Sequence, residues 1–114
     1  MDLINRTLLT LRPNEHFLEW LHQTGEENAD VKEEDLWEDN NAYLIEEVDD
    51  ESELEEVLKH RYRELFVAEL SDWVEDDRLW PDDLSYESFC VFFQAEVQTV
   101  VIDLVNESIQ REEY

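Results

Sequence analysis

The stretch LSYESFCVFFQAEVQTVVIDLVNESI, residues 84–109, decides which fold is predicted for this chain. Apolar residues recur in it at spacings of three and four, which is the periodicity of a helix. Several polar residues interrupt the run, so it is too polar to span a membrane. A helix that is apolar on most sides usually lies in a protein core. The residues expected to be buried on it are Phe89, Phe93, Val97, Val100 and Leu104.

One part of this stretch has a second interpretation. Residues 99–105 are rich in β-branched side chains, which favour a strand. No Gly, Pro or Asn separates them from Phe92, so a single helix is the preferred prediction. Ser85 or Asp83 is expected to cap its start. Cys90 falls inside the helical pattern and is expected to be a buried, inert thiol.

The residues before this stretch predict four more elements. Residues 3–12 and 42–48 have the partial alternation and composition of strands. Residues 15–23 and 53–74 have helical spacing. Residues 26–39 are polar and predict a loop with one helical turn.

Local signals fix where the two earlier helices begin. Pro13 is expected in the first turn of the first helix, where its missing N–H costs nothing. Asp49, Asp50 or Ser52 is expected to cap the second helix. Within that second helix Leu58, Leu65 and Phe66 are expected to be buried.

The predicted order is therefore β-α-β-α-α, in one domain over residues 1–114. Two strands alone do not make a stable sheet, so they must lie on the long helices or gain strands from another chain. A chain of this length suits a single hydrophobic core. We predict a small, mostly helical α+β domain with two long C-terminal helices packed against a small sheet.

The charge is the most unusual quantity in the composition. Thirty-three acidic residues face eight basic ones, for a net charge of −25. Such a surface repels nucleic acid and anionic lipid, and attracts basic partners and cations. We expect no direct nucleic-acid binding and no membrane binding. The first residues lack the basic and apolar regions of a signal peptide, so the expected location is the cytoplasm.

Glycine and cysteine are scarce enough to exclude several classes of site. Gly25 is the only glycine, and phosphate-binding loops, dinucleotide fingerprints and nucleophile elbows all need more than one. Cys90 is the only cysteine, which excludes an intrachain disulfide and a multi-cysteine metal site. We expect no cofactor.

Residues 26–56 contain sixteen acids and one base, Lys32. The segment could dock a basic partner protein, imitate the phosphate rows of duplex DNA, bind Ca²⁺, or be a solvated face that favours solubility. The Asp/Asn ladder of a calcium loop, with Gly at its sixth position, is missing. The expected partner-binding residues are Trp37, Glu46, Glu47, Asp49, Asp50, Glu51 and Glu53.

Three residues on the first helix offer a different chemistry. Glu19-x-x-His22 has the form of half a di-iron carboxylate motif, and His16 lies one turn away. No second copy of the motif exists, so we expect no metal. Our prediction is a non-enzymatic, acidic protein-interaction module. The alternatives are a DNA mimic that occupies a DNA-binding protein, and a small enzyme that uses carboxylates or His16 and His22.

Overall fold

The computed structural model describes residues 1–38 and 40–114. It confirms a small α+β domain. Its helices are α1 (Glu15–His22), α2 (Glu51–Trp73) and α3 (Tyr86–Phe92), with 3₁₀ turns η1 (Glu26–Asn28), η2 (Glu33–Trp37) and η3 (Asp77–Leu79). Its strands are β1 (Asp2–Leu3), β2 (Thr7–Pro13), β3 (Ala42–Ile45), β4 (Phe93–Gln98) and β5 (Ile102–Asp103). The predicted loop 26–39 contains η1 and η2, and its last residue, Asp39, lies outside the described part.

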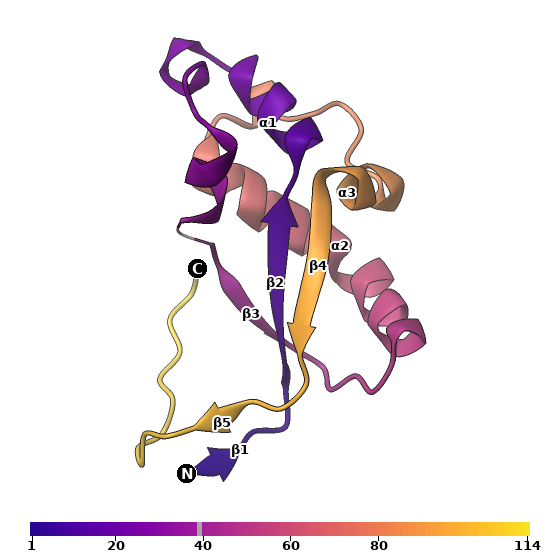
Figure 1. Cartoon of the computed structure of the whole chain (residues 1–114), viewed down its shortest axis with the longest axis vertical. Helices are drawn as coiled ribbons and strands as arrows, with labels where there is room; N and C mark the ends of the chain where they lie inside the picture. Colours follow the sequence, from indigo (N-terminus) through magenta and orange to yellow (C-terminus); the bar gives the residue numbers. More distant parts are fainter. Residues whose placement is uncertain (39) are drawn as a thin grey trace.

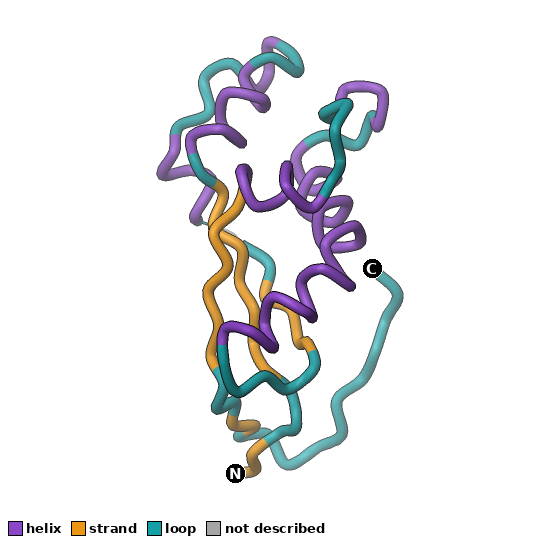
Figure 2. Tube along the Cα trace, turned by 90° about the vertical axis from the view of Figure 1, so that its right-hand side faces the viewer, coloured by secondary structure: helices purple, strands orange, loops and turns teal. Residues whose placement is uncertain are grey.

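The central strand of the main sheet is β2. It pairs antiparallel with β3 on one side and β4 on the other, so that Leu9 lies opposite both Tyr43 and Val97 (Figure 1). Alternate residues of β2 are buried, as the two-residue period of a strand requires. Figure 2 shows α2 along one face of this sheet. On the other face Gln94, Glu96 and Gln98 of β4 are exposed, and Trp37 of η2 stacks on Arg12 at the end of β2. The sheet therefore has one core face and one solvent face.

The helix predicted for residues 84–109 is wrong beyond Phe92. The backbone becomes extended at Phe93 (φ −133°, ψ 146°), which is the first residue of β4. In FQAEVQ, residues 93–98, apolar and polar residues alternate strictly, and pairing with β2 stabilises the extended form over the helical one. Of the two predicted long helices, α2 is confirmed, and the other is a short helix followed by a strand.

Two of the burial predictions for this stretch fail for the same reason. Val100 and Leu104 are 67% and 74% exposed, because they follow β4 instead of lying on a core helix. Val97 is only half-buried, on the core side of β4. Cys90 is exposed on α3, so its thiol is not the buried group that we expected. The strand alternative for residues 99–105 holds only at Ile102 and Asp103, which pair with β1.

The core is built around Phe66 of α2. Its ring lies 5.7 Å from that of Phe89 and 5.8 Å from that of Phe93, in edge-to-face geometry. Phe17 of α1 packs against Phe93 at 5.4 Å between ring centroids. The predicted burial of Phe89, Phe93, Leu58, Leu65 and Phe66 is confirmed.

Side-chain caps set the start of each α-helix. The Asn14 side chain accepts hydrogen bonds from the backbone of His16 and Phe17, so α1 begins after Asn14, and Pro13 ends β2 instead of opening the helix. Asp50 caps α2 and Ser85 caps α3, each one of the residues that we expected. Of the helices described, none combines the length and the apolar run that crossing a bilayer requires.

A pair of substitutions tests this core. Phe93→Ala should lower the free energy of unfolding by about 3–5 kcal/mol, because it removes a buried ring. Val100→Ala is the control on an exposed side chain and should cost less than about 0.5 kcal/mol. Urea unfolding measures both values. Similar losses for the two variants would contradict the strand assignment of residues 93–98.

Candidate functional site: an acidic groove beside α2

The residues predicted to bind a partner lie in two separate places. Trp37 is in η2, before β3, whereas residues 46–53 follow β3 and open α2. Consecutive strand residues are about 3.3 Å apart, so the length of β3 separates the two groups. Every described acidic residue from Glu26 to Glu56 is exposed.

Trp37 is already engaged within the chain. Its indole N–H donates to the carbonyl oxygen of Pro13 at 3.2 Å, and the guanidinium of Arg12 lies 4.0 Å from the ring centroid. The side chain is 38% exposed, so only part of the ring can meet another molecule. The stacked Arg12 offers that molecule a positive charge beside the indole.

The acidic group between β3 and α2 is held in place by its own hydrogen bonds. Glu46 accepts from Arg61 at 3.0 Å, and Asp50 accepts from the backbone N–H of Glu53 at 2.9 Å. Desolvation acts to raise the pKa of Glu46, but the hydrogen bonds to its carboxylate and the positive charge of Arg61 together outweigh it, so that this pKa is lowered. Carboxylates on a strand end and a capped helix start are more fixed in position than those on a mobile loop.

A groove of about 410 Å³ lies between η2 and the last turns of α2, next to the start of β3 (Figure 1). It brings part of the acidic segment together with acids that are distant in sequence. Asp35 and Glu38 come from η2 and the residue after it, and Glu69 and Asp72 come from α2. Its other lining residues are Asn40, Asn41 and Trp73.

Glu69 forms the floor of this groove and is only 7% exposed. The hydroxyl of Tyr43 donates to its carboxylate at 2.5 Å. The Asn41 amide donates to Asp72 and, at 3.3 Å, to the oxygen of Tyr43, and the Tyr114 hydroxyl also donates to Asp72. These bonds join β3, α2 and the C-terminal residue in one polar network.

Burial, together with the nearby charge of Asp72, raises the pKa of Glu69 to about 7, against the hydrogen bonds from Tyr43 and Asn41, which lower it. Burial and the contact with Glu69 also raise the pKa of Tyr43. Glu69 is therefore divided between its neutral and ionised forms near neutral pH. A cation entering the groove would favour the ionised form and release a proton.

Within residues 1–38 and 40–114, no three His, Cys, Asp or Glu side chains come together so that they could hold a metal. The Glu19-x-x-His22 pair stays a partial motif on α1, where the ring of His22 lies 2.7 Å from the carbonyl oxygen of Val31. His16 is exposed on the same helix.

Our sequence analysis did not select Glu69, Asp72 or Trp73 as site residues. A signal for Glu69 was present in the sequence. Glu69 continues the helical spacing of Leu58, Leu65 and Phe66, so a carboxylate stands on the core side of α2. An ionisable residue in phase with an apolar stripe indicates either a buried hydrogen-bonding partner or a functional site.

Comparisons with protein-family models, with curated proteins and with solved structures found no match to this chain.

The raised pKa of Glu69 predicts how stability changes with pH. The folded protein binds an extra proton between the unfolded pKa near 4.5 and the folded value of about 7. The contribution of Glu69 to stability is therefore fully present below the lower pKa and is lost as pH rises through the higher pKa. Between about pH 5 and pH 8 the free energy of unfolding should fall by roughly 2–3 kcal/mol through this group.

Glu69→Gln should remove most of that pH dependence while keeping an acceptor for Tyr43. Glu75→Gln, at an exposed position just after α2, is the control and should leave the dependence as in the wild type. Urea unfolding across the pH range measures each slope. Equal slopes for the wild type and Glu69→Gln would rule out the assignment to Glu69.

Proposed function

We propose that this protein is a non-enzymatic interaction module that binds a basic partner protein, and that a Lys or Arg side chain of the partner enters the acidic groove. One observation carries the proposal. Carboxylates from η2, from the residue after it and from α2 line a groove whose lining also includes Trp73. Carboxylates beside an aromatic ring attract a cation through both charge and cation–π interaction.

The charge of the whole chain supports the same kind of partner. A net charge of −25 steers a basic protein toward this one from a distance. The exposed carboxylates at positions 46, 47, 49, 50, 51 and 53 add to that field from the other end of β3. In this proposal they speed the encounter, and the groove supplies the close contact.

The ionisation of Glu69 gives this binding a pH dependence. A bound cation is attracted most strongly when Glu69 is charged, which requires a pH above about 7. Affinity for a basic partner should therefore rise from about pH 6 to about pH 8, while the stability of the free protein falls. The rise in affinity and the fall in stability both result from the ionisation of Glu69.

A DNA mimic is the second candidate. The observation that favours it is the fixed position of Glu46, Asp50 and Glu53, whose carboxylates each accept a hydrogen bond at the β3–α2 junction. A mimic needs carboxylates in ordered positions, and its partner would be a protein that also binds duplex DNA. The third candidate, a small enzyme, would place His16 or His22 beside a carboxylate in a cleft.

Two variants with the same change in charge test the groove. The groove variant is Asp35→Asn, Glu38→Gln and Asp72→Asn, and the matched control is Glu47→Gln, Asp49→Asn and Glu51→Gln at the β3–α2 junction. The probe is a fluorescent peptide of alternating lysine and glycine, and anisotropy measures its affinity. We expect about a tenfold loss for the groove variant and about a twofold to threefold loss for the control.

Salt and competition define the other outcomes. Binding should weaken as the Debye length falls from about 30 Å at 0.01 M salt to about 8 Å at 0.15 M. Equal losses of affinity for the two variants would mean that long-range charge alone explains the binding and that the groove has no role in it. Unchanged affinity in both variants would contradict the proposal and would indicate that the acidic surface serves only as a solvated face. For any DNA-binding partner, displacement by duplex DNA would favour mimicry.

A further inference from the structure

The end of the molecule opposite α1 has an exposed apolar surface. β1 and β5 form a two-residue ladder there, and the C-terminal segment after β5 runs back toward the start of β3 (Figure 1). Leu44, Ile102, Val105 and Ile109 are all exposed on this side. Together with Ile4 they line two adjoining hollows between β3 and the C-terminal segment.

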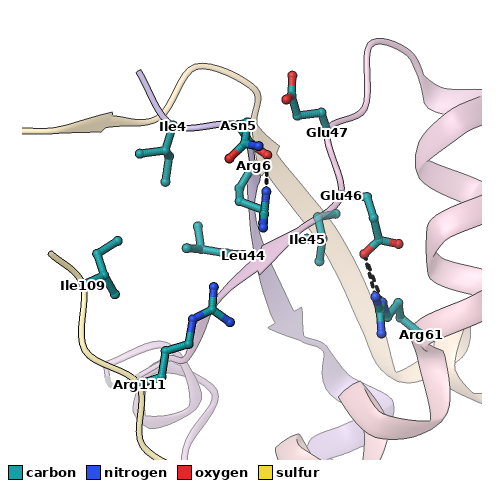
Figure 3. Close-up of a pocket in the computed structure, with 10 residues that line it drawn as sticks. All are labelled: Ile4, Asn5, Arg6, Leu44, Ile45, Glu46, Glu47, Arg61, Ile109 and Arg111. Carbon is teal, nitrogen blue, oxygen red and sulfur yellow. Dashed lines mark hydrogen bonds and ion pairs between the residues drawn. The ribbon is translucent and has the colours of Figure 1, made fainter. Parts of the chain in front are cut away.

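The larger hollow, of about 870 Å³, contains three of the eight basic residues in the chain, Arg6, Arg61 and Arg111. Figure 3 shows Arg111 and Ile109 on the C-terminal segment and Leu44 on β3, around the same space. Glu46 and Glu47 line it as well. Positive and negative groups are therefore nearly balanced here, on a protein in which acids outnumber bases four to one.

Part of this charge has no partner in the described chain. Arg61 pairs with Glu46 and with Glu64, at 3.0 Å and 2.9 Å. Among residues 1–38 and 40–114, neither Arg6 nor Arg111 forms an ion pair, and Glu47 forms none either. Arg6 donates only to the carbonyl oxygen of the adjacent Asn5, at 2.8 Å.

The edge of β3 on this side is also open. The sheet order is β3-β2-β4, so β3 has a partner on one side only, and its other edge faces the C-terminal segment (Figure 1). An open edge beside exposed apolar side chains favours contact with another chain.

We propose that this face, formed by Ile4, Arg6, Leu44, Ile102, Val105, Ile109 and Arg111, is the interface of a homodimer. A second copy presents the same mixture of apolar side chains, unpaired arginines and unpaired carboxylates. In a two-fold contact every pairing occurs twice, so Arg6 and Arg111 of each copy can meet Glu47, or Glu107 of the adjoining hollow, in the other copy. The contact would cover the apolar side chains and pair these charges.

Charge explains why the occupant is a second copy. A strongly acidic partner would be repelled by the rest of the chain, and a strongly basic one would meet arginines at this face. Two copies also repel each other over their whole surfaces, but at this face three arginines stand against Glu46 and Glu47, which reduces that repulsion. Dimerisation should therefore strengthen as salt rises, whereas binding of a basic peptide should weaken.

Sedimentation velocity at several protein concentrations, in low and high salt, tests the dimer. The wild type should shift from monomer toward dimer as concentration and salt increase. Ile109→Asp, in the exposed C-terminal segment, should weaken association at least about tenfold, since it puts a charge in the apolar contact. Val91→Asp makes the same change at an exposed position on α3 and should leave association unchanged.

Thermal unfolding of each variant confirms that it is folded. A wild type that stays monomeric at every concentration and salt would overturn the proposal. Equal weakening by Ile109→Asp and Val91→Asp would also overturn it, because the effect would then be one of net charge. Binding of the lysine peptide is measured separately and has the opposite salt dependence, so the two proposals fail independently.

Discussion

The pairing of β2 on both sides is the constraint on which the rest of the structure depends. β2 brings β3 from the middle of the chain and β4 from near its end into one sheet. That arrangement turns Thr7, Leu9 and Leu11 toward α2, whose Phe66 meets Phe93 of β4. The start of β3 is also placed beside the end of α2, and the acidic groove lies at that junction.

The buried carboxylate of Glu69 affects both the stability of this junction and the charge of the groove. Ionising a carboxylate that is almost fully buried costs free energy. In this protein the carboxylate of Glu69 is stabilised by a hydrogen bond from the Tyr43 hydroxyl and not by an arginine or lysine. The same network reaches Asp72 and Tyr114, so the C-terminal residue is tied to α2. The groove walls are thus held by polar contacts whose strength changes when Glu69 gains or loses its proton. The neighbouring hydrophobic core contains apolar side chains that do not titrate.

The sequence predicted the elements whose signals were local. The helical spacing of Leu58, Leu65 and Phe66, and caps such as Asp50 and Ser85, gave α2 and the start of α3 correctly. The stretch 84–109 was misread because its apolar spacing fits a helix, while residues 93–98 also alternate as a strand does. Only the neighbouring β2 decides between the two, and that neighbour is far away in the sequence. The groove was missed for the same reason, since α2 supplies half of its carboxylates.

The pairing of Leu9 with Val97 has a consequence for how this protein is made. During synthesis β2 leaves the ribosome before all three α-helices, and β4 leaves after them. One side of β2 therefore has no partner strand until residues 93–98 have emerged, and the local helices can form before the sheet is complete. The high negative charge keeps nascent chains apart over that interval, which protects an unpaired strand from joining the wrong neighbour.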